Sequence, residues 1–199
     1  MSGGPPELIL ASGSPRRREL LAEMGVLFEV KTAAVAELDG NSWPRRNPYD
    51  IARENARRKA KAIAHSFHGM GRWVLGADTV VALDGRLFGK PASLEEAAEF
   101  LRALSGRTHE VITGCALIDP QGGEEIFHEA THVTFRALTE DVIEKYLATV
   151  HVLDKAGAYA LQEHGDWIIE RVEGSRTNVI GLPTEALETF LLRYRAAQS

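Results

Sequence analysis

Two hydrophobic periods alternate along the chain and divide it into strands and helices. Short apolar runs typical of buried strands are separated by stretches in which apolar residues recur every three or four positions, as on one face of a helix. Four of these stretches carry a start signal, which is a Ser or Thr cap or a proline at the first helical position. The predicted helices are 15–24, 48–67, 93–105, 139–149 and 184–195.

The apolar runs between the helices predict strands, several of them in hairpins. A strand over 73–83 turns back at "DG", and "HEVITGCALID" is joined by "PQGG" to a second run, so both predict antiparallel pairs. Because strands and helices interleave without repeats, the pattern predicts an α/β protein with a mixed sheet. The other predicted strands are 8–11, 27–33 and 166–172, and the predicted loops include 153–165 and the glycine-marked 173–183.

The composition narrows the class of protein. With 199 residues, 44% of them apolar, the chain suits one domain or a domain with a small lobe. A single cysteine excludes a disulfide framework and a cysteine-rich zinc site within the chain. No apolar run approaches the roughly 20 residues that span a bilayer, and the polar start "MSGGPPE" does not resemble a signal peptide. We therefore expect a cytoplasmic protein without a membrane partner.

The charge is unevenly distributed. The net charge is −5, yet residues 1–61 carry eleven Lys and Arg against eight Asp and Glu. A mildly acidic protein is a poor general binder of nucleic acid, and no aromatic residues interleave with the cations at 16–18 and 57–61, so we expect no nucleic-acid partner. Nucleic-acid binding through those cations is the alternative. Any basic site is therefore expected to be local, in the N-terminal third.

The stretch "LILASGSPRRRELL" places three arginines in the first turn of a predicted helix. Cations there oppose the helix dipole, at about 0.3–1 kcal/mol each when exposed. An anion would remove this cost. A phosphate bound by the helix N-terminus, by the hydroxyls of Ser12 and Ser14, and by one or two guanidinium groups fits this pattern.

A lysine and an aspartate stand at unusual positions. Lys59 lies on the apolar stripe of the helix from Pro48, where a lysine more often extends to water but can face a phosphate. Asp78 interrupts an apolar strand in "VLGADTVV". Such a carboxylate can hold a divalent metal or polarise a water, or it can be a strand-end aspartate satisfied by backbone N–H groups. Lys90 follows a turn that could return it to the neighbourhood of Asp78.

The remaining candidates are less specific. Asp154 and Lys155 lie in a glycine-containing loop, and Gln162, which offers both a donor and an acceptor, follows near a turn. Each of these is more often an ordinary loop residue. His65 and His68 have no neighbouring carboxylate and are read as surface residues. The motifs GxxxxGK[ST], GxGxxG after the first strand and GxSxG are absent, which weakens kinase, P-loop, dehydrogenase and esterase interpretations.

These residues together are suited to hydrolysis of a phosphoanhydride, in which cations neutralise a polyphosphate and carboxylates bind a metal or orient a water. Six ordered motifs also resemble the Maf family of nucleotide pyrophosphatases over nearly the whole chain. They are "LILASGSPRRRELL", "GADTVV", "GKP", "LSGRTHEVITG", "DKAGAYALQ" and "NVIGLP".

The resemblance implies an elongated α/β fold, similar to inosine-triphosphate pyrophosphatases, in which residues 1–199 form one domain with two lobes around a central cleft. It implies cleavage of a nucleoside triphosphate to the monophosphate and pyrophosphate with a divalent cation (Mg²⁺, Mn²⁺ or Co²⁺), and a possible homodimer. It assigns catalysis to Asp78, Lys90 and Glu37, with Asp78 as proton acceptor, metal binding to Glu37 and Asp78, and substrate binding to Ser12, Arg16, Arg17, Lys59, Thr79 and Gln162.

Three of these positions distinguish subgroups of the family. Arg16, Thr79 and Gln162 resemble the members that act on dTTP and UTP, whereas relatives acting on 7-methyl-GTP carry a tryptophan at the first position. We therefore expect thymidine and uridine nucleotides, including modified pyrimidines, with 7-methyl-GTP or a broader specificity as the alternative. A nucleotide-binding regulator of septum formation is a further alternative, since the family is associated with that process. Glu163 stands at a position where glycine is frequent in the family, and Arg176 and Thr177 stand where tyrosines are frequent. These differences bear on base preference.

Overall fold

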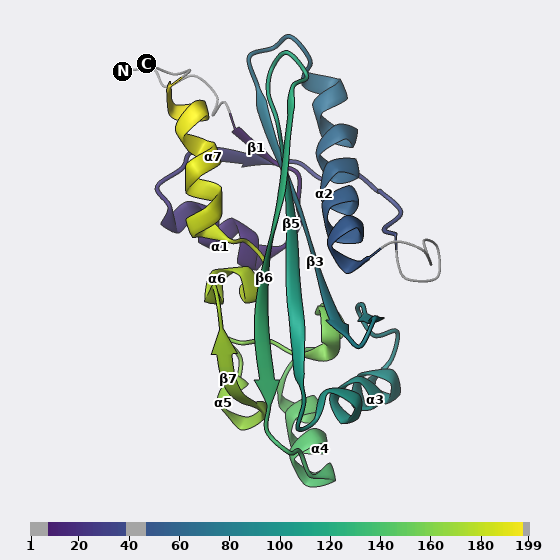
Figure 1. Cartoon of the computed structure of the whole chain (residues 1–199). Coiled ribbons are helices and arrows are strands. Elements are labelled where there is room, and N and C mark those ends of the chain that lie inside the picture. The colour runs from purple at the N-terminus through teal and green to yellow at the C-terminus, as the bar shows by residue number, and fades with distance from the viewer. Residues whose placement is uncertain (1–7, 39–46, 197–199) are drawn as a thin grey trace.

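The computed structural model describes residues 8–38 and 47–196, and these build one mixed sheet of seven strands (Figure 1). The strand order is β2-β1-β3-β5-β6-β7, and β4 pairs with β3 beside this row. Strands β1, β2 and the start of β3 are parallel, while all other pairs are antiparallel. The strands are β1 Leu8–Leu10, β2 Phe28–Val30, β3 Trp73–Leu83, β4 Arg86–Phe88, β5 Thr108–Ile118, β6 Glu124–Phe135 and β7 Ile169–Glu173.

The helices begin where the sequence carries caps. Ser14, Asn47, Ser93 and Thr139 each accept a hydrogen bond from a backbone N–H of the first turn, and Pro15 and Pro48 occupy the first helical positions. The helices are α1 Pro15–Glu23, α2 Pro48–Ala64, α3 Leu94–Leu104, α4 Glu140–Thr149, α5 Gly165–Ile168, α6 Arg176–Ile180 and α7 Thr184–Ala196, with short 3-10 turns at His65–Phe67 and Ala156–Ala158.

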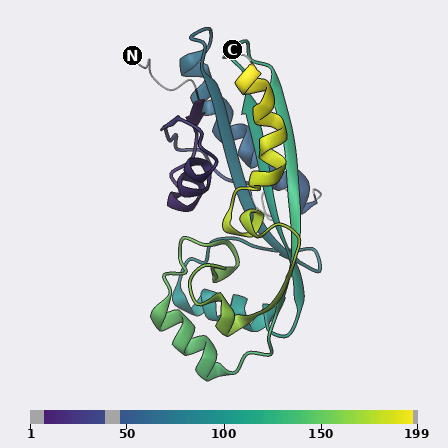
Figure 2. The ribbon, with the colours of Figure 1, turned by 90° about the vertical axis from the view of Figure 1, so that its left-hand side faces the viewer.

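The long strands β3, β5 and β6 run through an elongated molecule and carry different helices on its two faces (Figures 1 and 2). In the half that contains β1 and β2, α2 covers one face, while α1 and α7 cover the other. In the opposite half, α3 and α4 pack with β4 and the ends of the long strands around a third core. The sheet therefore runs through both halves, and side chains from either half can reach the residues that lie between them.

Two glycines allow α2 to lie unusually close to the sheet. A Cβ atom on Gly76 of β3 would lie 2.8 Å from the Ala60 nitrogen and closer still to the Ala56 carbonyl oxygen, and one on Gly114 of β5 would collide with the backbone of Ala52. The three alanines are fully buried. We call this contact, between the glycines of the strands and the alanines of α2, the alanine seam. Small residues on both sides of it set the distance between α2 and the sheet, and so determine which polar side chains beside it can contact each other.

Replacement of Gly76 by alanine is expected to lower the free energy of unfolding by about 2–3 kcal/mol, because the new methyl group meets backbone atoms that cannot rotate away. Chemical denaturation measures the loss. Gly89→Ala is the matched control, since nothing lies within 4 Å of a Cβ there. Equal stability of the two variants would contradict the close approach of α2.

The structure corrects parts of the sequence prediction. Residues 166–168 were predicted as strand but form the short helix α5, and the glycine-marked segment 173–183 contains the helix α6, which begins after the Ser175 cap. "GAD" does not interrupt β3, because Gly76 to Asp78 pair with β5 in unbroken register. The predicted loop beyond Leu38 lies partly outside the described residues, and the one-domain, two-lobe description stays a prediction. Among the described helices, none is both long and apolar enough to cross a membrane.

Candidate active site

A gap along one edge of β3 forms the bottom of a large cleft. On that edge β1 pairs with Trp73–Leu75 and β4 pairs with Val81–Leu83. Between them, residues 76–80 have no described strand partner on this edge and pair only with β5 on the other. The cleft has a volume of about 1090 Å³ and is lined by residues from both halves of the molecule. Because successive side chains of a strand point to opposite faces, Asp78 lies toward α2 and Thr79 toward α1 and α6.

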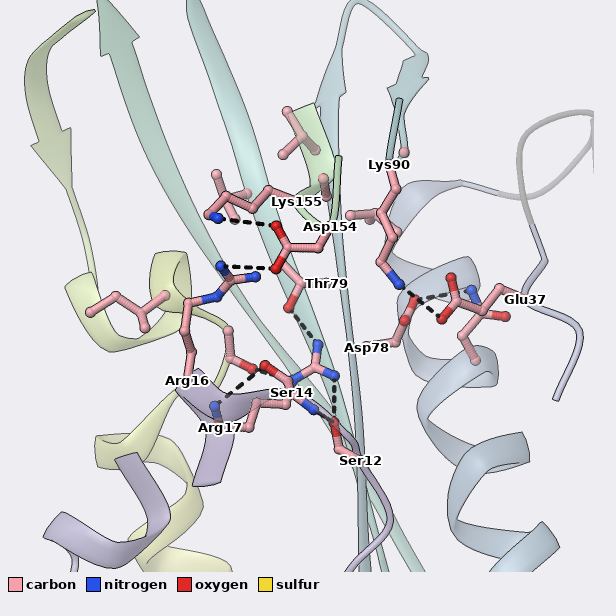
Figure 3. Close-up of a pocket in the computed structure, with 18 of the residues that line it drawn as sticks. Ser12, Ser14, Arg16, Arg17, Glu37, Asp78, Thr79, Lys90, Asp154 and Lys155 are labelled. Carbon is pink, nitrogen blue, oxygen red and sulfur yellow. Dashed lines mark hydrogen bonds and ion pairs between the residues drawn. The ribbon is translucent and has the colours of Figure 1, made fainter. Parts of the chain in front are cut away.

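The corner between β1 and α1 presents its polar groups to this cleft (Figure 3). Ser14 caps α1 by accepting from the Arg17 backbone N–H. The Arg17 side chain turns inward and is 9% exposed. Its guanidinium donates from Nε to the Gly181 carbonyl at 2.8 Å, from one terminal nitrogen to Ser12 Oγ at 3.1 Å, and from the other to Thr79 Oγ1 at 3.0 Å.

The three arginines of this helix have different environments. All three acceptors of Arg17 are uncharged, and no described carboxylate lies within 4 Å of it. Burial lowers the pKa of Arg17, although Asp78 acts against this at longer range. Arg16 lines the cleft, and Arg18 is exposed to solvent. A buried guanidinium without a counter-ion is costly, so the corner is electrostatically suited to an anion.

On the opposite side of the cleft, Asp78 forms a polar cluster with α2. Asp78 is 5% exposed, and its two oxygens accept from Lys59 Nζ at 2.6 Å and from Asn55 Nδ2 at 3.0 Å. Lys59 and Asn55 lie four residues apart, hence on one side of the helix beside the alanine seam. Asn55 also bonds both backbone groups of Leu38 and so holds the loop that carries Glu37.

Glu37 completes this cluster. Its Oε1 lies 2.7 Å from Lys59 Nζ and 3.7 Å from Lys90 Nζ, and the Lys90 side chain reaches it from the segment after β4. Burial of Glu37 opposes its ionisation, but Lys59, Lys90 and Arg17 outweigh this effect, so its pKa is lowered. Glu37 is therefore charged at neutral pH and pairs with both lysines.

The donor set of this cluster fits a divalent cation that arrives with a phosphate ligand. Oxygens of Glu37 and Asp78 converge on a single cation, the Lys59 ammonium, at 2.7 and 2.6 Å. Mg²⁺ is commonly bound by one or two carboxylates together with substrate phosphates. Within the part of the chain that the structure describes, no group of three or more His, Cys, Asp or Glu side chains could hold a metal by itself. The two carboxylates could therefore supply only part of the ligand set of a metal.

The far rim of the cleft contributes a buried lysine. Lys155 is 5% exposed and donates to the carboxylates of Asp154 at 3.0 Å and Glu163 at 3.2 Å, as well as to the His151 carbonyl. Burial opposes ionisation of Asp154, but Lys155 and then Arg16 outweigh this effect, so the pKa of Asp154 is lowered. Arg16 lies 3.8 Å from Asp154, and this ion pair crosses the cleft (Figure 3).

All the site residues predicted from the sequence border the same cleft, including Gln162, which is exposed on the rim. Their catalytic and binding roles stay predictions. The sequence analysis did not select Asn55, although its position four residues before Lys59 was a usable signal. It treated Lys155 as an ordinary loop residue, and it overlooked the buried Thr113 and Asn178, whose polar side chains pair only through the tertiary structure.

Comparison with known proteins places this geometry in context. The family model described as Maf-like protein matches residues 7–194. A dTTP/UTP pyrophosphatase from Nitratidesulfovibrio vulgaris is 46% identical, covering 94% of this chain and 87% of the relative. A dTTP/UTP pyrophosphatase from Akkermansia muciniphila is also 46% identical, covering 96% and 99%.

A similar fold occurs in a solved structure of much lower sequence identity. The HAM1 protein from Coxiella burnetii is 17% identical, with a TM-score of 0.52 over 94% of this chain and 99% of that chain. At this identity the likeness concerns the fold alone. The predicted α/β architecture with a mixed sheet is confirmed.

Proposed function

The chain belongs to the Maf family, and from this premise we propose that it is a nucleoside triphosphate pyrophosphatase that hydrolyses dTTP and UTP to the monophosphate and pyrophosphate. The observation that carries the proposal is the buried Arg17 guanidinium, which faces the cleft corner with neutral acceptors only. A polyphosphate supplies the missing negative charge. The N-terminus of α1 and the hydroxyl of Ser12 add donors at the same place.

The cleft separates a phosphate-binding side from a side that activates water. Arg17 and Arg16 neutralise the polyphosphate from α1, while Lys90 approaches it from the opposite side (Figure 3). Lys59 lies on that opposite side as well, between Glu37 and Asp78. Asp78 accepts a proton from the attacking water, the new bond forms between that water and phosphorus, and the anhydride bond between the α- and β-phosphates breaks. Pyrophosphate leaves with its charge stabilised by the same cations.

Nucleotide pyrophosphatases of this kind generally depend on a divalent metal. In this proposal Glu37 and Asp78 hold Mg²⁺, Mn²⁺ or Co²⁺ together with the phosphates, because their oxygens already converge on one cation. A bound divalent cation neutralises phosphate charge and makes a coordinated water more acidic. Lys59, whose ammonium lies between these two carboxylates, would then have phosphate oxygens as its acceptors.

In this proposal, residues at the rim of the cleft select the nucleotide base. Gln162 is exposed there with a donor and an acceptor, which suits the edge of a pyrimidine, and Arg16 of α1 lines the same cleft. Thr79 is already bonded to Arg17, so its effect on the nucleotide passes through the guanidinium. A cytoplasmic location and a homodimer belong to the same proposal.

The test is a screen for pyrophosphate release from natural and modified triphosphates, with Mg²⁺, Mn²⁺ or Co²⁺ and with EDTA as control. We expect dTTP and UTP to be hydrolysed fastest, pyrophosphate instead of orthophosphate as the product, and no turnover in EDTA. Preference for 7-methyl-GTP would overturn the substrate assignment. Failure to hydrolyse any triphosphate would favour a nucleotide-binding regulator over an enzyme.

A further inference from the structure

Two hydroxyl groups, of the half-buried Thr79 and the buried Thr113, form a hydrogen-bonded chain that connects Arg17 to α6 along one face of the sheet. Thr79 of β3 and Thr113 of β5 lie directly opposite each other in register, and their hydroxyl oxygens are 2.9 Å apart. Thr113 is fully buried and is not part of the cleft wall. Its hydroxyl also lies 3.0 Å from the backbone carbonyl of Asn178 in α6.

The direction of the hydrogen bonds in this chain follows from the chemistry of its last member. A carbonyl oxygen can only accept, so the single hydroxyl proton of Thr113 is donated to Asn178. Thr79 must therefore donate its own proton to Thr113. This leaves the Thr79 oxygen as an acceptor, and the Arg17 guanidinium donates to it at 3.0 Å.

The same chain closes into a ring around Arg17. The Asn178 carbonyl that accepts from Thr113 also accepts from the Gly181 backbone N–H at 3.0 Å. The carbonyl of Gly181 in turn accepts from Arg17 Nε at 2.8 Å. Two of the three acceptors of the guanidinium, Thr79 and Gly181, are thus connected to the one hydroxyl of Thr113.

We propose that Thr113 is a positioning residue for the triphosphate site, acting through Thr79 and Gly181 on the orientation of Arg17. The inference rests on the proposed function, in which Arg17 binds phosphate. Without the hydroxyl of Thr113, Thr79 loses the acceptor that orients its proton, and α6 loses a bond next to Gly181. Both losses loosen the guanidinium, although Thr113 itself touches no ligand.

A neighbouring threonine provides a matched control. Thr131 of β6 is also fully buried and also bonds α6, since its hydroxyl donates to the Ser175 carbonyl at 3.0 Å and accepts from Asn178 Nδ2 at 2.9 Å. The hydrogen bonds of Thr131 lead to α6 but not to Thr79 or Arg17. Loss of its hydroxyl removes one of the two hydrogen bonds of Asn178 Nδ2. The other, to the Val111 carbonyl at 3.0 Å, and the bond from Thr113 to the Asn178 carbonyl still hold α6, so all three acceptors of Arg17 remain in place.

The experiment compares Thr113→Val, Thr113→Ser and Thr131→Val with the parent chain. Calorimetry measures the Kd of inorganic triphosphate, which has no base and needs no turnover, and kinetics with dTTP separate KM from kcat. In Thr113→Val we expect Kd and KM to rise about tenfold, as for the loss of one hydrogen bond, with kcat changed by less than about threefold. Thr113→Ser should restore both constants, and Thr131→Val should leave them unchanged.

Unchanged Kd and KM in Thr113→Val would overturn the inference, and so would an equal rise of both constants in Thr131→Val. If Thr113→Val does not fold, Thr113→Ala provides the same comparison without the added methyl group. If the parent chain binds triphosphate but does not hydrolyse dTTP or UTP, the proposed function fails, while the calorimetric comparison still decides the role of Thr113.

Discussion

Replacement of Asp78 by asparagine is expected to lower the rate of pyrophosphate release about a thousandfold, because the amide cannot accept the proton of the attacking water. The substitution keeps the shape of the side chain, so Lys59 and Asn55 stay near it. Binding of triphosphate in the absence of metal is expected to change by less than about threefold, since the cations that face the phosphates remain. Single-turnover kinetics and calorimetry measure the two effects separately.

The hydrogen bonds around Asp78 give the substitution a structural effect of its own, separate from the loss of the proton acceptor. Asn55 is held in one orientation by both backbone groups of Leu38, so its NH₂ group faces residue 78. The new amide NH₂ of Asp78→Asn would meet this group in one of its two orientations and the Lys59 ammonium in the other. Asp119→Asn makes the same chemical change in a turn outside the cleft. Hydrolysis by Asp78→Asn at the parent rate would exclude Asp78 as the proton acceptor.

Replacement of Arg17 by methionine is expected to weaken triphosphate binding about a hundredfold, as for the loss of charged hydrogen bonds to phosphate. The free energy of unfolding without ligand should fall by no more than about 1 kcal/mol, because the substitution also removes a buried charge that has no counter-ion. The stabilisation that triphosphate gives the parent chain in thermal unfolding should be lost.

Arg18→Met is the control for this variant, since it removes an exposed arginine from the next position of the same helix. It should leave both affinity and stability near the parent values. A purely structural Arg17 would give the opposite pattern in Arg17→Met, with a large loss of stability and unchanged affinity.

The parts of the fold that could be predicted depend on local interactions. The caps Ser14, Ser93 and Thr139 each bond a backbone N–H within their own first turn, so residues a few positions apart determine where those helices begin. The short helices α5 and α6 were not recognised, because four or five residues cannot form a stable helix alone. They depend on packing against β5, β6 and β7, whose positions the local pattern does not contain.

For the site, local sequence is enough to bring cations, hydroxyls and a helix N-terminus together at one corner, because those residues are neighbours in the chain. The inward turn of Arg17, while Arg18 faces water, depends on long-range contacts, since two acceptors of Arg17 lie on Thr79 and Gly181, far away in sequence. The pairing of Asp78 with Lys59 likewise required α2 to approach β3 over Gly76. A chain encodes its charges locally, but their partners depend on contacts that form only when distant segments pack together.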